Sequence, residues 1–117
     1  MAKFLLIYRG GEGDESKMSP EEMQQILGKW NAWIGEGFAK GWMVDPGDAL
    51  YPAAKIVSPK KVVTDGPFAE SKEIVGGYSV VLAETIDGAA EHAKGCPHLA
   101  NGGSIEIRQL MGLAPPQ

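Results

Sequence analysis

The sequence predicts an α+β fold, a ferredoxin-like antiparallel sheet with two helices on one face. Apolar, β-rich segments open the chain and recur in its second half, and each is followed by a segment with helical periodicity. Residues 53–57 and 61–64 flank a Ser-Pro-Lys turn and predict a hairpin. A final alternating segment closes the order strand, helix, strand with a hairpin, strand, helix, strand, which is typical of this fold.

The first strand is expected over residues 3–9, and its apolar residues occupy both parities. Ser19, Pro20 and Glu22 have the spacing of a helix start, with serine as the cap and glutamate three residues later. Gly41 is expected to end this helix. Apolar residues at steps of three and four predict one buried stripe along it: Met23, Ile26, Leu27, Trp30, Trp33, Ile34 and Phe38.

The strongest strand signal covers residues 74–83, and it again carries apolar residues on both parities. Gly76-Gly77 at its start predicts a β-bulge or a close approach of another group. Thr85 is expected to cap the second helix, on which His92 is interpreted as solvated. The last strand is expected over residues 104–111.

Composition limits the class of protein. A chain of 117 residues is expected to form a single domain, residues 1–112, with residues 113–117 as a flexible tail. The net charge of −4 argues against direct binding of nucleic acid. The N-terminal apolar run is too short for a signal peptide or a membrane span, and the single Cys96 excludes an intrachain disulfide, so a cytoplasmic protein without a membrane partner is expected.

The sheet is expected to have two apolar faces, because neither the first strand nor the strand at residues 74–83 has a strongly polar parity. The helices cover one face. A second subunit is the economical cover for the other, so the sequence predicts a homodimer.

Asp65-Gly66-Pro67 is a turn, in which Asp65 either stabilises the turn through backbone N–H groups or points outward as a functional acid. In this order and spacing, the following segments resemble the DGPF branch of the YCII-related proteins: 4–8, 19–22, 65–68, 76–78, 96–97 and 102–108. The resemblance implies a dimeric α+β barrel and an Asp and a His suspected of enzymatic work, which correspond to Asp65 and His98. Some members of that family are joined to a sigma-factor-like region, which implies a regulatory association.

An Asp65–His98 pair is chemically reasonable, since a carboxylate on one ring nitrogen of histidine fixes the tautomer and leaves the other nitrogen to accept a proton. No metal is expected, because two histidines without ligand spacing are too few for a zinc site. No cofactor is expected either, since phosphate-binding and dinucleotide-binding motifs are absent from the sequence.

Arg108 shares one parity of the last strand with Glu106 and is a candidate for holding a substrate carboxylate, provided that this parity faces the barrel interior. Tyr8 and Tyr78 are candidates for lining the same cavity, or for dimer packing. Two hypotheses follow. One is a small cofactor-free enzyme that applies general acid–base chemistry to a small polar or anionic organic molecule. The other is a dimeric ligand-binding or regulatory module associated with transcription.

Overall fold

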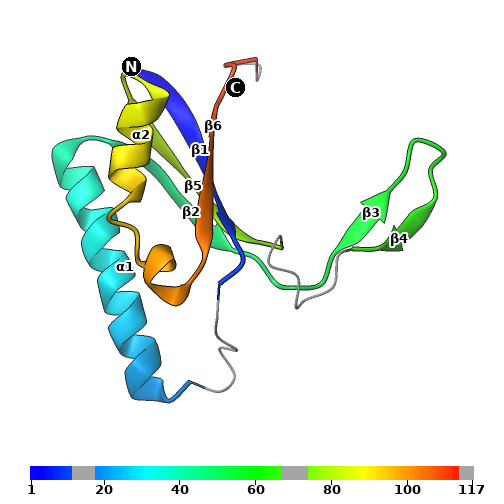
Figure 1. Cartoon of the computed structure of the whole chain (residues 1–117), viewed down its shortest axis with the longest axis horizontal. Helices are drawn as coiled ribbons and strands as arrows, with labels where there is room; N and C mark the ends of the chain where they lie inside the picture. Colours follow the sequence, from blue (N-terminus) through cyan, green and yellow to red (C-terminus); the bar gives the residue numbers. More distant parts are fainter. Residues whose placement is uncertain (12–17, 67–73, 114–117) are drawn as a thin grey trace.

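The computed structural model describes residues 1–11, 18–66 and 74–113. Expectations for Pro67 and Phe68 of the DGPF segment, and for residues 114–117 of the tail, lie outside the described residues. Within those ranges the chain forms a four-stranded sheet, a separate two-stranded hairpin, two α-helices and a short 3₁₀ helix (Figure 1). The elements are β1 (Ala2–Arg9), α1 (Pro20–Lys40), β2 (Met43–Ala49), β3 (Lys55–Val57), β4 (Val63–Asp65), β5 (Val75–Ala83), α2 (Ile86–Ala93), η2 (Pro97–Asn101) and β6 (Ser104–Gln109).

The main sheet has the strand order β2-β5-β1-β6, and every neighbouring pair is antiparallel. Both helices cover the same face of this sheet (Figure 1). This arrangement confirms the predicted ferredoxin-like α+β fold.

Helix α1 begins and ends where the sequence predicts. The Ser19 hydroxyl accepts a hydrogen bond from the Glu22 N–H at 3.1 Å, which satisfies one of the free donors of the first turn. Gly41 ends the helix in the left-handed conformation (φ 82°). The predicted apolar stripe is broader than the buried face, because Leu27 and Phe38 are 53% and 52% exposed.

Helix α2 is capped by Thr85, whose hydroxyl accepts from the Gly88 N–H at 3.0 Å, as predicted. His92 is half-buried rather than solvated as expected. Its ring stacks on Trp42, with centroids 4.3 Å apart and planes 8° apart. Burial of this ring, reinforced by the charge of Lys40, lowers the pKa of His92.

Strand β5 contains the predicted irregularity. Its pairing with β1 shifts register where Tyr8 faces Gly77 and Arg9 faces Val75, which leaves Gly76 as the extra residue of a bulge. Gly77 is also a point of close approach, because a Cβ there would lie 2.8 Å from the Asp48 carbonyl oxygen. Glycine is therefore needed where β2 and β5 meet.

The core lies between the helices and the near face of the sheet. It is formed by large apolar side chains from the central strands, β2 and α1, with small residues where α2 packs closely. Its buried hydrophobic members are Phe4, Leu6, Tyr8, Trp33, Met43, Val81, Ala83, Ala89, Ala93 and Cys96.

The opposite face of the sheet carries the other parity of the same strands. Leu5 and Ile7 of β1 and Val80 and Leu82 of β5 are half-buried there. This open face is apolar at its centre, as the two-parity pattern predicted.

The hairpin β3–β4 stands apart from the main sheet (Figure 1). Every residue of both strands is exposed.

Candidate active site

His98 lies in η2, where Pro97 occupies the first position and the left-handed Gly102 ends the helix. The ring nitrogen Nε2 lies 3.0 Å from the carbonyl oxygen of Arg9 at the end of β1. Since a carbonyl oxygen only accepts hydrogen bonds, Nε2 carries the proton in this contact. In the neutral ring Nδ1 is then the nitrogen with a free lone pair.

Two neighbours hold the imidazole of His98 in place. The Tyr8 ring packs against it, with centroids 5.4 Å apart and planes tilted by 48°. Gly103 lies directly beside the ring, and a Cβ at that position would collide with Nε2 and its adjacent carbons. The chain therefore needs glycine at position 103 for His98 to reach Arg9.

Tyr8 belongs to a chain of buried hydrogen bonds beneath His98. Its hydroxyl donates to the Ser79 hydroxyl at 2.6 Å, and Ser79 donates to the Pro46 carbonyl oxygen at 2.7 Å. These two hydrogen bonds join β1 to β5 and to β2. The buried Cys96 thiol lies close enough to Tyr8 to interact with it electrostatically.

Burial is the main cause of the pKa shifts of Tyr8 and of the neighbouring Cys96. It raises the pKa of the Tyr8 hydroxyl above its ordinary range and raises the pKa of the Cys96 thiol to about 11. Cys96 is 3% exposed. A protonated, buried thiol is a poor nucleophile, since the thiolate is the reactive form.

Arg9, Glu106 and Arg108 form a charged cluster on the open face of the sheet. The Arg9 Nε donates to Glu106 Oε1 at 2.8 Å, and Arg108 lies 3.5 Å from Glu106 Oε2. The Arg108 side chain is 71% exposed. Ile105 and Ile107 on the other parity of β6 pack against the core, so the charged parity faces away from the helices.

Asp65 and His98 do not meet within one chain. Asp65 ends β4, where its carboxylate bonds to Lys55 Nζ across the hairpin at 2.6 Å, and its side chain is 87% exposed. The hairpin and η2 occupy separate parts of the molecule. The group that orients His98 within the chain is the Arg9 carbonyl.

Tyr8 and Tyr78 do not line one cavity within a chain either. Tyr78 pairs with Ile7 and shares its parity, so it lies on the open face and is 36% exposed. Tyr8 points to the helices and is 6% exposed. Of the three residues predicted to contact substrate, Tyr78 and Arg108 lie on the open face of the sheet. Tyr8 lies on the face covered by the helices, where its ring packs against the ring of His98.

Comparison with known families agrees with this architecture. The model of the YCII-related domain matches residues 42–113, which is more than half of the chain. The chain belongs to the YCII-related family. Among curated proteins, none matches this YCII-related chain. The matched segment contains His98, Tyr78, Arg108 and Asp65, whereas Arg9 and Tyr8 lie before it.

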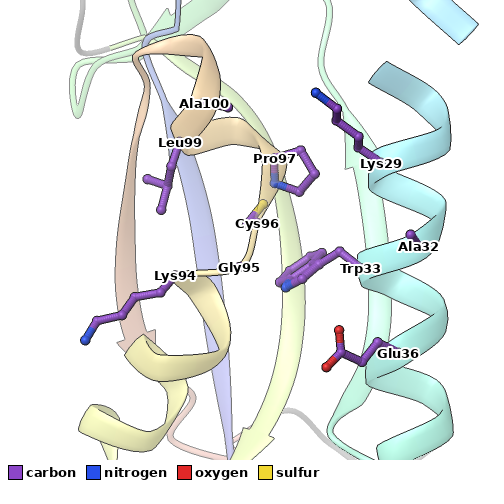
Figure 2. Close-up of a pocket in the computed structure, with 10 residues that line it drawn as sticks. All are labelled: Lys29, Ala32, Trp33, Glu36, Lys94, Gly95, Cys96, Pro97, Leu99 and Ala100. Carbon is purple, nitrogen blue, oxygen red and sulfur yellow. The ribbon is translucent and has the colours of Figure 1, made fainter. Parts of the chain in front are cut away.

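A groove of about 480 Å³ lies beside η2 in this YCII-related protein, between α1 and the segment that leads out of α2. Figure 2 shows Trp33 reaching from α1 towards Cys96 and Pro97 across the groove. The residues on both sides of His98, Pro97 and Leu99, line it, but His98 itself does not. The His98 ring therefore faces the end of the sheet rather than this groove.

Within residues 1–11, 18–66 and 74–113, no group of three or more His, Cys, Asp or Glu side chains is placed to hold a metal ion. In the same part of the chain, no helix has the length and apolar character needed to span a membrane.

Sequence reasoning missed Arg9 and Gly103. The Arg9 carbonyl is a backbone acceptor, which no side-chain pattern reports. The Arg9 side chain had a usable signal, because it shares the parity of Leu5 and Ile7 and therefore belongs to the open face.

Proposed function

We propose that this YCII-related protein is a homodimeric enzyme that needs no cofactor and uses His98 as a general base on a small anionic organic molecule. The observation that carries the proposal is the 3.0 Å contact between His98 Nε2 and the Arg9 carbonyl oxygen. It fixes the tautomer in which Nδ1 accepts a proton. A base oriented in this way contributes a factor of roughly 10² to 10⁴ in rate.

The charged cluster on the open face supports an anionic ligand. Arg9 links the two features, since its carbonyl orients His98 and its guanidinium pairs with Glu106. Arg108 reaches the same carboxylate and remains largely exposed. A guanidinium binds a carboxylate through two parallel hydrogen bonds, so Arg108 is the proposed substrate anchor.

The homodimer is supported by the open face. Leu5, Ile7, Val80 and Leu82 form its apolar centre, and Tyr78 lies beside them. Two such faces packed together bury both centres and enclose the charged cluster in a dimeric α+β barrel. Enclosure strengthens the attraction between Arg108 and an anion by excluding water.

We also propose a revised role for Asp65. Because the Arg9 carbonyl occupies Nε2, the Asp65 carboxylate is not needed to orient the ring. In the proposed dimer Asp65 acts on the substrate as the second acid–base group, delivered by the hairpin of the other copy. The Asp-Gly-Pro-Phe segment supports placing the chain in the DGPF branch, and Asp65 and Gly66 are the residues of that segment that the structure describes.

The alternative function is a dimeric ligand-binding or regulatory module. The separation of Asp65 from His98 within a chain favours it, because a binding module needs no such pair. In that case the cluster of Arg9, Glu106 and Arg108 senses an anion without converting it. An association with transcription rests only on the domain arrangement implied by the resemblance.

The test is base-catalysed exchange of carbon-bound protons in a panel of small enolisable carboxylic acids, followed by NMR in D2O. The wild-type protein is expected to accelerate exchange for at least one acid. His98→Gln is expected to lose at least about 100-fold of that acceleration. Gly103→Ala, which pushes the ring away from Arg9, is expected to show a similar loss with His98 still present.

His92→Phe is the matched control, because it changes the other histidine while keeping a flat ring against Trp42. It is expected to retain the wild-type rate. Exchange that persists in His98→Gln would remove His98 from the mechanism. An acid that binds without exchange or turnover would favour the regulatory module.

A further inference from the structure

We propose that the β3–β4 hairpin, residues 51–66, is an arm that packs against a second copy of this chain at the end of its sheet that carries His98. This inference deepens the proposed homodimer and rests on it.

The arm is apolar where a surface hairpin is expected to be polar. Ile56, Val57 and Val63 are 50%, 65% and 58% exposed, and Val62 in the turn is 55% exposed. Tyr51 at its base is 93% exposed. Both faces of the arm therefore expose apolar side chains, since Val57 and Val63 pair on one face and Ile56 lies on the other. Exposed apolar surface on an extended element is typical of a protein contact surface.

The arm is nevertheless well formed. The Ser58 N–H donates to the Val62 carbonyl oxygen, and the Val62 N–H donates to the Ser58 hydroxyl. At the base, the Gly66 N–H donates to the Ala54 carbonyl oxygen at 2.9 Å. An isolated two-stranded hairpin is marginally stable in water, so an ordered arm of this composition fits a packing partner.

The direction of the arm indicates the partner. Figure 1 shows the hairpin on the side of the main sheet opposite the two helices, which is the side towards which the open face points. A second copy seated on the open face therefore lies beside the arm. At the base of the arm, an apolar cleft of about 430 Å³ provides a receptor for side chains of that copy: Leu50, Tyr51, Pro52, Ala53, Ala54, Ile74 and Val75.

The arm leaves the sheet at the end that carries His98. Ala49, the last residue of β2, pairs with Gly77, and Gly77 also pairs with Tyr8 beside Arg9. A twofold axis that runs along the strands brings these same ends of the two sheets together. Each arm, with the Lys55–Asp65 ion pair at its root, then overlies the His98 end of the other copy.

The size of the molecule supports a partner of this extent. The chain exposes 8575 Å², whereas a compact monomer of this mass exposes roughly 6,200 Å². The radius of gyration is 15.7 Å, against roughly 13 Å for a compact domain of this length. A homodimer commonly buries on the order of 1,000 Å² or more on each subunit, which is within the excess area.

The test is sedimentation equilibrium of the full chain across micromolar concentrations. Val57 and Val63 are direct cross-strand partners, so the double variant Val57→Lys, Val63→Glu removes apolar area and retains a favourable opposite-charge pair within the hairpin. Its dimer dissociation constant is expected to rise at least about 100-fold, because both arms of the dimer lose apolar contacts. Ile56→Thr, on the other face of the arm, is expected to weaken the dimer more modestly while keeping a good strand former.

The matched control is Leu27→Glu, which places a charge on an apolar residue of α1 that is 53% exposed. It is expected to leave the dimer unchanged. A wild-type dimer whose stability ignores all three arm substitutions at 56, 57 and 63 would overturn the arm and leave the homodimer intact. A wild-type protein that stays monomeric throughout would overturn the homodimer, and the arm with it.

Discussion

Ser79→Ala tests the buried hydrogen bonds that hold Tyr8, whose ring packs against His98. Ser79 is 0% exposed and accepts from the Tyr8 hydroxyl while donating to the Pro46 carbonyl oxygen, at 2.6 and 2.7 Å. The substitution leaves the buried Tyr8 hydroxyl without its acceptor, at a cost of about 1–3 kcal/mol. The loss of the bond to Pro46 adds about 0.5–1 kcal/mol, since Pro46 is at the exposed edge of β2.

The expected total is therefore about 1.5–4 kcal/mol of unfolding free energy. Tyr8→Phe is expected to cost less, about 1 kcal/mol, because Ser79 keeps its bond to Pro46 and no donor is left unmatched on the ring. The double variant is expected to be little worse than Ser79→Ala alone, since the two changes break the same bond.

Urea unfolding of the wild type, the two single variants and the double variant at one fixed protein concentration measures these differences. The slope of unfolding free energy against urea concentration should be the same for all four, which checks that their unfolding is comparable. Strict additivity of the single substitutions would refute the reasoning, because it would mean that Tyr8 and Ser79 do not share a hydrogen bond.

Gly28→Ala and Gly35→Ala are each expected to stabilise α1 by up to about 1 kcal/mol, because a Cβ added at either position would have no atom within 4 Å apart from the adjoining residues and nearby backbone of its own helix. A lower urea midpoint for either variant would contradict this. The pKa of the Cys96 thiol is raised to about 11 in the folded protein. Cys96 is therefore expected to react with iodoacetamide at pH 8 roughly 100-fold more slowly in the folded than in the urea-unfolded protein. Equal rates would exclude a buried, protonated thiol. Because the pKa of His92 is lowered in the folded state, the unfolded chain binds the proton more readily, so stability is expected to fall as the pH falls below the ordinary histidine value of about 6.5. His92→Phe should reduce this acid dependence, and an unchanged pH profile in that variant would assign the dependence to other groups.

The sequence predicted the local features of the fold because those features depend on neighbouring residues. Ser19 and Thr85 cap their helices through side chains that reach the backbone three residues on. Gly41 ends α1, and the Gly76-Gly77 pair marks the bulge of β5. Each of these follows from the conformational or hydrogen-bonding properties of one or two residues.

The site was less predictable because its contacts join residues far apart in the chain. The parity of a strand shows which of its residues share a face. Because both faces of β1 are apolar, the sequence did not show which face is covered by the helices, or that Tyr8 and Tyr78 lie on opposite faces of the sheet. His98 was expected to pair with a carboxylate, whereas its partner in the chain is the Arg9 carbonyl. His92 was interpreted as solvated because of its charged neighbours, and the stacking on Trp42 depends on how α2 packs.

The central claim is that His98 is a base that acts through Nδ1 on an anionic ligand. Nitrogen-15 NMR of the histidine ring nitrogens tests it most directly, with His92 in the same sample as an internal reference. The His98 ring is expected to carry a proton on Nε2, and its Nδ1 signal is expected to shift when a small carboxylate binds while His92 does not respond. A neutral ring protonated on Nδ1, or ring signals of His98 that ignore a carboxylate bound by the protein, would contradict it.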